Sequence, residues 1–210
     1  MKKLFQKYNH ILTLLYLPVY LIWFSWLERR EGSYTLISMP IDYEIPFCEY
    51  FILPYLAWFL FVPAILGYLF FYSKEEYLQA CALLFSGMTI FLILCTIWPN
   101  GLNLRQDISY HENFCAKLVQ ILYKTDTSTN VFPSLHVFNT LGCLIALYNS
   151  KGTKGHPIVV SLATILGVLI ILATMFLKQH SVWDVIGAFV LAAILYCIFY
   201  LPSRKKPKAN

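Results

Sequence analysis

Six apolar runs limit the fold of this chain more than any other feature of its sequence. Five of them contain no Asp, Glu, Lys or Arg, and the sixth contains a single aspartate. A helix of about 20 apolar residues crosses the hydrocarbon core of a bilayer, so the runs predict an all-α, polytopic membrane protein. The fourth run is short enough to be a buried core helix instead, but the number of crossings would then be odd. The runs cover residues 11–27, 51–72, 78–98, 134–148, 157–177 and 182–201.

The composition agrees with a membrane protein, because 59% of the 210 residues are hydrophobic and only 13% are charged. The net charge of +5 does not indicate a nucleic-acid partner, since the basic residues lie in short loops and tails between the apolar runs. The first run ends in Trp26-Leu27-Glu28 without a small-residue cleavage site, so it is interpreted as a helix and not as a secretory signal. We therefore expect one six-helix membrane domain over residues 1–210.

The longest connection, residues 99–133, carries a helical pattern of its own. Phe114, Leu118, Ile121 and Leu122 recur at helical spacing between polar residues. This pattern predicts a short amphipathic helix that lies on the membrane surface, in the loop between the third and fourth spans.

The distribution of lysine and arginine predicts the orientation in the membrane. If both termini lie on one side, that side holds ten of the sixteen basic residues, and the positive-inside rule makes it the cytoplasmic side. Those ten are Lys2, Lys3, Lys7, Lys74, Lys151, Lys154, Arg204, Lys205, Lys206 and Lys208. The six on the outer side are Arg29, Arg30, Arg105, Lys117, Lys124 and Lys178.

A histidine and an aspartate at the start of the last run form the most informative motif. If the helix begins near Ser181, His180 and Asp184 are four residues apart and face the same way, so the carboxylate can hold one ring nitrogen. An ionisable residue at membrane depth is costly, which favours a functional role for Asp184. The alternative is a structural pair at the membrane interface.

Three segments meet on the outer face in this topology, and together they supply the groups that phosphoryl transfer needs. Arg105 can bind phosphate oxygens bidentately. The helix that starts near Ser134 offers backbone N–H groups and a positive dipole end to an anion. Of the two imidazoles, His136 and His180, one can attack phosphorus while the other protonates the leaving oxygen. The alternatives are a loop arginine near lipid headgroups and a serine that serves only as a helix N-cap.

This set of residues resembles the three-part signature of the type 2 phosphatidic acid phosphatase superfamily. That superfamily contains the lipid phosphate phosphatases, and its relatives include vanadium haloperoxidases and sphingolipid synthases. Its signature is written KxxxxxxRP, PSGH and SRxxxxxHxxxD. The order and the separations fit residues 98–187 of this chain, and the six-helix layout extends the resemblance more loosely over the whole.

The resemblance implies a role for each matching residue. Arg105 matches the arginine of the first motif, which is a phosphate ligand, and Ser134 matches the serine that lines the phosphate pocket. His136 matches the histidine that protonates the leaving group. His180 matches the nucleophile that forms a phosphohistidine, and Asp184 matches the carboxylate that orients this nucleophile.

The chain departs from the signature at several positions. Trp98 and Gln106 replace the lysine and the proline of the first motif, and Leu135 replaces a glycine that eases close backbone approach. An Ala-Thr pair at residues 173–174 replaces Ser-Arg, so a second phosphate-binding arginine is missing. Lys178 is the nearest cation that can stand in for it, with an interfacial lysine as the alternative. These departures bear on the substrate class more than on the chemistry, because sphingolipid-synthase-like relatives also lack that arginine.

The resulting hypothesis is a monomer-capable phosphatase that hydrolyses a phosphomonoester or pyrophosphate of a lipid at the outer face of the cell membrane. The alternatives are a lipid phosphotransferase resembling sphingolipid synthases and a non-catalytic binding or transport protein on the same scaffold. No cofactor or metal is expected, because His111, Glu112 and His180 match no zinc spacing. The expected partners are the amphiphilic phosphorylated lipid and the membrane lipids, without nucleic acid or an obligate protein partner.

Overall fold

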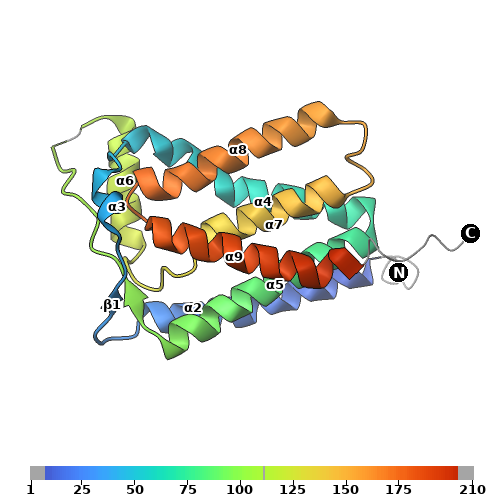
Figure 1. The fold of residues 1–210 in the computed structure, drawn as a ribbon, viewed down its shortest axis with the longest axis horizontal. Coiled ribbons are helices and arrows are strands. Elements are labelled where there is room, and N and C mark those ends of the chain that lie inside the picture. The colour runs from blue at the N-terminus through green and yellow to red at the C-terminus, as the bar shows by residue number, and fades with distance from the viewer. Residues whose placement is uncertain (1–7, 111, 203–210) are drawn as a thin grey trace, which may run out of the picture.

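The computed structural model describes residues 8–110 and 112–202 and is nearly all-α, with long helices that run roughly side by side (Figure 1). The long elements are η1 Asn9–Leu15 continued by α2 Tyr16–Glu28, α4 Ile52–Tyr72, α5 Lys74–Ile97, α7 Leu135–Asn149, α8 Pro157–Phe176 and α9 Val182–Phe199. Short elements gather at one end of the bundle: β1 Thr35–Leu36, α3 Pro40–Glu44, η2 Glu49–Phe51, β2 Asn100–Gly101 and α6 Phe114–Thr125.

Five helical segments in the described part of the chain are long and apolar enough to cross a membrane. They are Asn9–Glu28, Glu49–Tyr72, Lys74–Ile97, Pro157–Phe176 and Val182–Phe199. The helix α7, which corresponds to the fourth predicted span, has only 15 residues. Five apolar spanning-length helices are therefore observed, and the sixth crossing stays a prediction.

The helix α7 lies inside the bundle and packs against α4, α5, α8 and α9. Its Phe138 is fully buried, and a Cβ atom built on Gly87 of α5 would lie 2.0 Å from the tip of that ring. The glycine therefore lets α5 approach α7 closely, as small residues do where membrane helices meet. Large apolar side chains such as Leu60 and Phe71 point outward instead, as expected of surfaces that face lipid.

The helix α6 lies across the end of the bundle, between α5 and α7 in the chain (Figure 1). The amphipathic helix predicted in this loop is thus present, and two of the four predicted apolar residues, Leu118 and Leu122, pack against the core. Cys115, Ala116 and Val119 are buried, whereas Phe114 and Ile121 are more than half exposed. The helix α6 packs against η2 and α4, so the buried face is centred on its smaller residues.

The other end of the bundle holds the start and the end of the described chain (Figure 1). There Lys74 donates a hydrogen bond to Asn9, Gln79 donates to the carbonyl of Phe199, and Ser150 donates to Glu76. Both described ends and the loops near Lys74 and Lys151 are thus opposite to α3 and α6, as the predicted topology requires. Seven of the basic residues used for that prediction lie outside the described residues: Lys2, Lys3, Lys7, Arg204, Lys205, Lys206 and Lys208.

Candidate active site

The first turn of α9 fixes the position of Asp184. Ser181 is the N-cap, and its hydroxyl oxygen accepts a hydrogen bond from the backbone N–H of Trp183 at 3.0 Å. Asp184 Oδ2 in turn accepts from the backbone N–H of Ser181 at 2.9 Å, which completes a capping box. The Asp184 side chain is fully buried as a result.

His180 lies directly before this cap, with its Nδ1 atom 3.3 Å from Asp184 Oδ2. A carboxylate oxygen can only accept at this contact, so Nδ1 carries the proton and Nε2 keeps its lone pair. The contact thus gives His180 the tautomer of a nucleophile, with its reactive nitrogen on the side of the ring away from Asp184.

Ser134 connects the start of α7 to the start of α9. Its hydroxyl oxygen caps α7 by accepting from Val137 N–H at 3.4 Å, and its own N–H donates to the carbonyl oxygen of Asp184 at 3.1 Å. This bond holds the first turns of the two helices together. The rings of His136 and His180, from segments far apart in the sequence, therefore lie with their centroids 6.1 Å apart.

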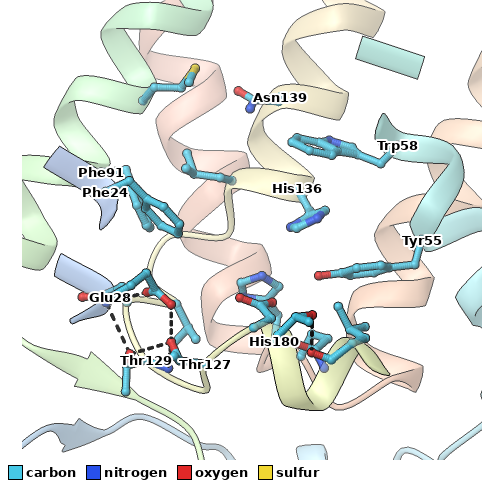
Figure 2. Close-up of a pocket in the computed structure, with 18 of the residues that line it drawn as sticks. Phe24, Glu28, Tyr55, Trp58, Phe91, Thr127, Thr129, His136, Asn139 and His180 are labelled. Atoms are coloured by element: carbon cyan, nitrogen blue, oxygen red, sulfur yellow. Dashed lines mark hydrogen bonds between the residues drawn. The ribbon is translucent and has the colours of Figure 1, made fainter. Parts of the chain in front are cut away.

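Two aromatic side chains of α4 hold the His136 ring. The ring centroid of His136 is 4.5 Å from that of Tyr55 and 4.4 Å from that of Trp58. Figure 2 shows the Trp58 ring above His136, the Tyr55 ring below it, and His180 also on the lower side. The Nε2 atom of His136 is buried and has no hydrogen-bond partner among the described residues, so it can exchange a proton with a ligand.

Both imidazoles line a cavity of about 410 Å³ (Figure 2). Its walls come from α2, α4, α5, α7, the end of α6 and the loop after it. Six aromatic and several polar side chains line it together with the histidines: Tyr20, Phe24, Glu28, Tyr55, Trp58, Phe59, Phe91, Asp126, Thr127, Thr129, Asn130, Asn139 and Gln179.

The guanidinium of Arg105 lies behind this wall. It donates four hydrogen bonds, to the carbonyl oxygens of Tyr123, Asp126 and Thr127 and to the side-chain oxygen of Gln179, at 2.8–3.1 Å. It also stacks on Tyr123, with Cζ 4.8 Å from the ring centroid. Arg105 is not among the residues that line the cavity, so the predicted phosphate ligand here acts as a clamp on the loop after α6.

Replacing Arg105 with alanine is therefore expected to destabilise the fold. Loss of several charge-assisted bonds leaves the carbonyl oxygens unpaired and should cost about 3 kcal/mol, or roughly 5 °C or more in unfolding temperature. Thermal unfolding in detergent measures this, with the exposed Arg29→Ala variant as the control. Loss of phosphate release at unchanged unfolding temperature would instead favour the phosphate-ligand role.

Two other predicted phosphate ligands also lie away from the cavity. Lys178 has a positive φ of 55°, and its ammonium group donates to the carbonyl oxygens of Asp42 and Ile45. Burial lowers the pKa of Lys178, with the opposing charge of Asp42 limiting the effect. Ser134 is fully buried, with its N–H and hydroxyl used as described above. Both residues are thus paired with backbone groups, and their roles as phosphate ligands stay predictions.

Sequence reasoning missed several residues around the histidines. Gln179 lines the cavity, and its Nε2 atom is buried without a partner among the described residues, as is Oδ1 of Asn139. Tyr55 and Trp58 are three residues apart in an apolar run, a spacing that alone is typical of ordinary packing. Glu28 directly follows the first apolar run and indicates only the boundary of a span by its position, although a carboxylate at that depth is a signal for function.

Replacing Asp184 with asparagine tests the orienting contact. The amide oxygen can still accept from Ser181 N–H, so the α9 cap should survive with a loss of less than about 1 kcal/mol. The negative charge that stabilises the imidazolium is lost, and turnover should fall by about a hundredfold. Phosphate release measures the loss of turnover, and thermal unfolding of the same sample measures the loss of stability. A turnover of Asp184→Asn equal to that of the wild type would contradict the role of Asp184.

Comparison with known proteins supports one family. A model of the PAP2 superfamily matches residues 105–208, which include α7, α8, α9 and both site histidines. Searches of curated proteins and of solved structures each give no match. Among the described residues, no group of three or more His, Cys, Asp and Glu side chains is arranged to hold a metal ion, and His111 lies outside them.

Proposed function

Because this chain belongs to the PAP2 superfamily, we propose that it is a membrane phosphatase that cleaves a lipid phosphate through a phosphohistidine. The observation that carries the proposal is the pair of imidazoles. His136 and His180 lie 6.1 Å apart at one cavity, and His180 contacts the buried carboxylate of Asp184. A single phosphoryl group placed between the rings would reach both of them.

In the first step, His180 Nε2 attacks phosphorus and forms an N–P bond. The bond between phosphorus and the lipid oxygen breaks, and protonated His136 gives its proton to that oxygen, so the lipid leaves as an alcohol, or as a phosphate if the substrate is a pyrophosphate. Asp184 stabilises the positive charge that develops on the His180 ring.

In the second step, a water molecule attacks the phosphorus of the phosphohistidine. His136, now neutral, accepts a proton from this water, the N–P bond breaks, and His180 returns to its starting state. The same residue thus acts first as the general acid and then as the general base, which leaves the enzyme ready for another cycle.

The start of α7 supports the charge of the transferred group. In any α-helix the first N–H groups have no partner within the helix, and in α7 these belong to Leu135 and His136, which both line the cavity. Such N–H groups and the positive end of the helix dipole stabilise an anion. In this proposal they supply stabilisation that the missing arginine of the third motif would otherwise give.

We place this reaction at the outer face of a cell membrane, with both termini in the cytoplasm. The support is the basic residues Lys74, Lys151 and Lys154 at the end opposite to the site. The lipid identity is left at the level of a phosphomonoester or pyrophosphate of an amphiphile.

A transferase is the second candidate, and one observation favours it. Six aromatic side chains and several aliphatic ones line the cavity, and such apolar walls limit the access of water and suit an apolar acceptor. In that case a lipid alcohol, and not water, takes the phosphoryl group from His180. Product analysis with a labelled lipid phosphate, with and without an added alcohol, distinguishes the two outcomes.

The direct test is phosphate release from a panel of lipid phosphates by the purified protein in detergent, with and without a chelator. We expect release that is insensitive to the chelator. Release that depends on added metal ions, or no release from any member of the panel, would contradict the proposal.

A further inference from the structure

We propose that Gln179, the residue directly before the nucleophile, binds the phosphoryl group through its side-chain amide and brings the charge of Arg105 to bear on it. Gln179 is then a phosphate-binding residue, and Arg105 is a positioning residue that acts through it. This inference rests on the proposed function, because it takes the phosphorus to lie between His136 and His180.

The cavity offers a phosphate no basic side chain. None of the described residues that line it is a lysine or an arginine, whereas Glu28 and Asp126 are acids. Burial raises the pKa of Asp126 above its ordinary value, although the nearby Arg105 acts against this. Phosphate oxygens in this cavity therefore have to be bound by neutral donors, and a neutral donor with a cation behind it is better than one without.

The hydrogen bond from Arg105 fixes the orientation of the Gln179 amide. Arg105 Nη2 lies 2.8 Å from Oε1 of Gln179, and the atom that faces a guanidinium has to be the oxygen, because a guanidinium has only donors. Both N–H groups of Nε2 thus remain for another acceptor. The Gln179 side chain lines the cavity, and its Nε2 atom is buried without a partner among the described residues. Since buried donors are nearly always paired, this one indicates a ligand.

The end of α8 places Gln179 beside the nucleophile. The helix ends in a Schellman motif, in which Lys178 has a left-handed φ of 55° and its N–H donates to the carbonyl oxygen of Met175. The N–H groups of Gln179 and His180 both donate to the carbonyl oxygen of Thr174, at 2.9 and 3.0 Å. Thr174 occupies the position at which the third motif has its arginine. The backbone at that position thus holds the glutamine and the nucleophile together.

Two other buried nitrogen atoms without partners among the described residues belong to the lining of the same cavity. They are Nε1 of Trp58 on α4 and Nε2 of His136 on α7. Figure 2 shows the Trp58 ring close to His136, with Glu28 on the opposite side of the cavity. Three elements therefore each supply an unpartnered nitrogen, and a phosphoryl group, with several acceptor oxygens, is a ligand that suits such a set.

A purely structural Gln179 would only tie the segment before α9 to Arg105. The Gln179→Glu substitution separates the two roles, because a carboxylate oxygen still accepts from Arg105 while the donor becomes an acceptor that repels phosphate. Gln179→Met removes the donor without adding a charge, so it separates loss of the hydrogen bond from repulsion. Gln106→Glu is the matched control, because it makes the same change at an exposed position next to Arg105.

Binding is measured without turnover, from the rise in unfolding temperature of the purified protein in detergent as inorganic phosphate is added. Sodium chloride at equal ionic strength is the reference. We expect Gln179→Met to weaken phosphate binding about tenfold and Gln179→Glu about a hundredfold, with similar losses in lipid phosphate release. Without phosphate, Gln179→Glu should unfold at no lower temperature than the wild type. Gln106→Glu should leave binding and release unchanged.

Wild-type phosphate affinity in Gln179→Glu would overturn the role of Gln179, as would a wild-type protein that does not bind phosphate. A loss in Gln179→Glu without a loss in Gln179→Met would also overturn it, since repulsion alone explains that result. Failure of the catalytic proposal looks different. Phosphate would then bind in a way that depends on Gln179, which supports the binding site, but the wild-type protein would release phosphate from no lipid phosphate.

Discussion

Replacement of His180 with alanine is expected to lower lipid phosphate turnover by about a thousandfold or more, which corresponds to roughly 4 kcal/mol of transition-state stabilisation. The reason is that no other described group with a free lone pair lies beside both His136 and a buried carboxylate. Without Nε2 no phosphohistidine can form, and water would have to attack the lipid phosphate directly.

Two measurements check this prediction. Initial rates of phosphate release on the best lipid of the panel give the loss, and brief incubation with a labelled lipid phosphate followed by an alkaline quench detects an acid-labile phospho-protein. His156→Ala, a histidine exposed near the opposite end of the bundle, should keep both the rate and the label. A non-catalytic scaffold predicts instead that His180→Ala leaves the biochemical behaviour unchanged.

The helices were predictable because membrane helices have a simple requirement. The chain has to satisfy its own backbone groups over about 20 residues, so uncharged apolar runs become helices wherever they are long enough. The α4 and α8 boundaries lie within a few residues of the predicted ones, whereas α5 starts four residues early because Ser73 caps it. The same reasoning does not predict the short length of α7. This helix packs among four other helices, so its length does not have to match the thickness of the bilayer.

The meeting of the two histidines also followed from the sequence, because each stands at a helix start on the same side of the predicted topology. The directions of the basic side chains could not be predicted from the sequence. Arg105 and Lys178 bind carbonyl oxygens that belong to α6, its following loop and the segment before α4. Which carbonyls lie near a loop cation depends on long-range packing, and spacing along the chain contains no information about it.

Replacement of His136 with glutamine is expected to lower turnover by about 10²–10⁴-fold with lipid substrates, and much less with an aryl phosphate. A lipid alkoxide is a poor leaving group that needs a proton as it departs, whereas a phenolate leaves without one. Glutamine can keep the contacts of the imidazole with Tyr55 and Trp58, so the cavity should retain its shape. The dependence on the leaving group therefore reports the acid role separately from any effect on packing.

The measurement compares wild-type and His136→Gln protein on a lipid phosphate and on a nitrophenyl phosphate, with thermal unfolding of both as the check on structure. The ratio of the two losses is the informative quantity, because misplacement of His180 would slow both substrates alike. Similar losses on both would mean that His136 positions the phosphoryl group and does not protonate the leaving oxygen. A large loss confined to the lipid substrate would assign the proton to the imidazole of His136, whose Nε2 atom is buried without a partner among the described residues.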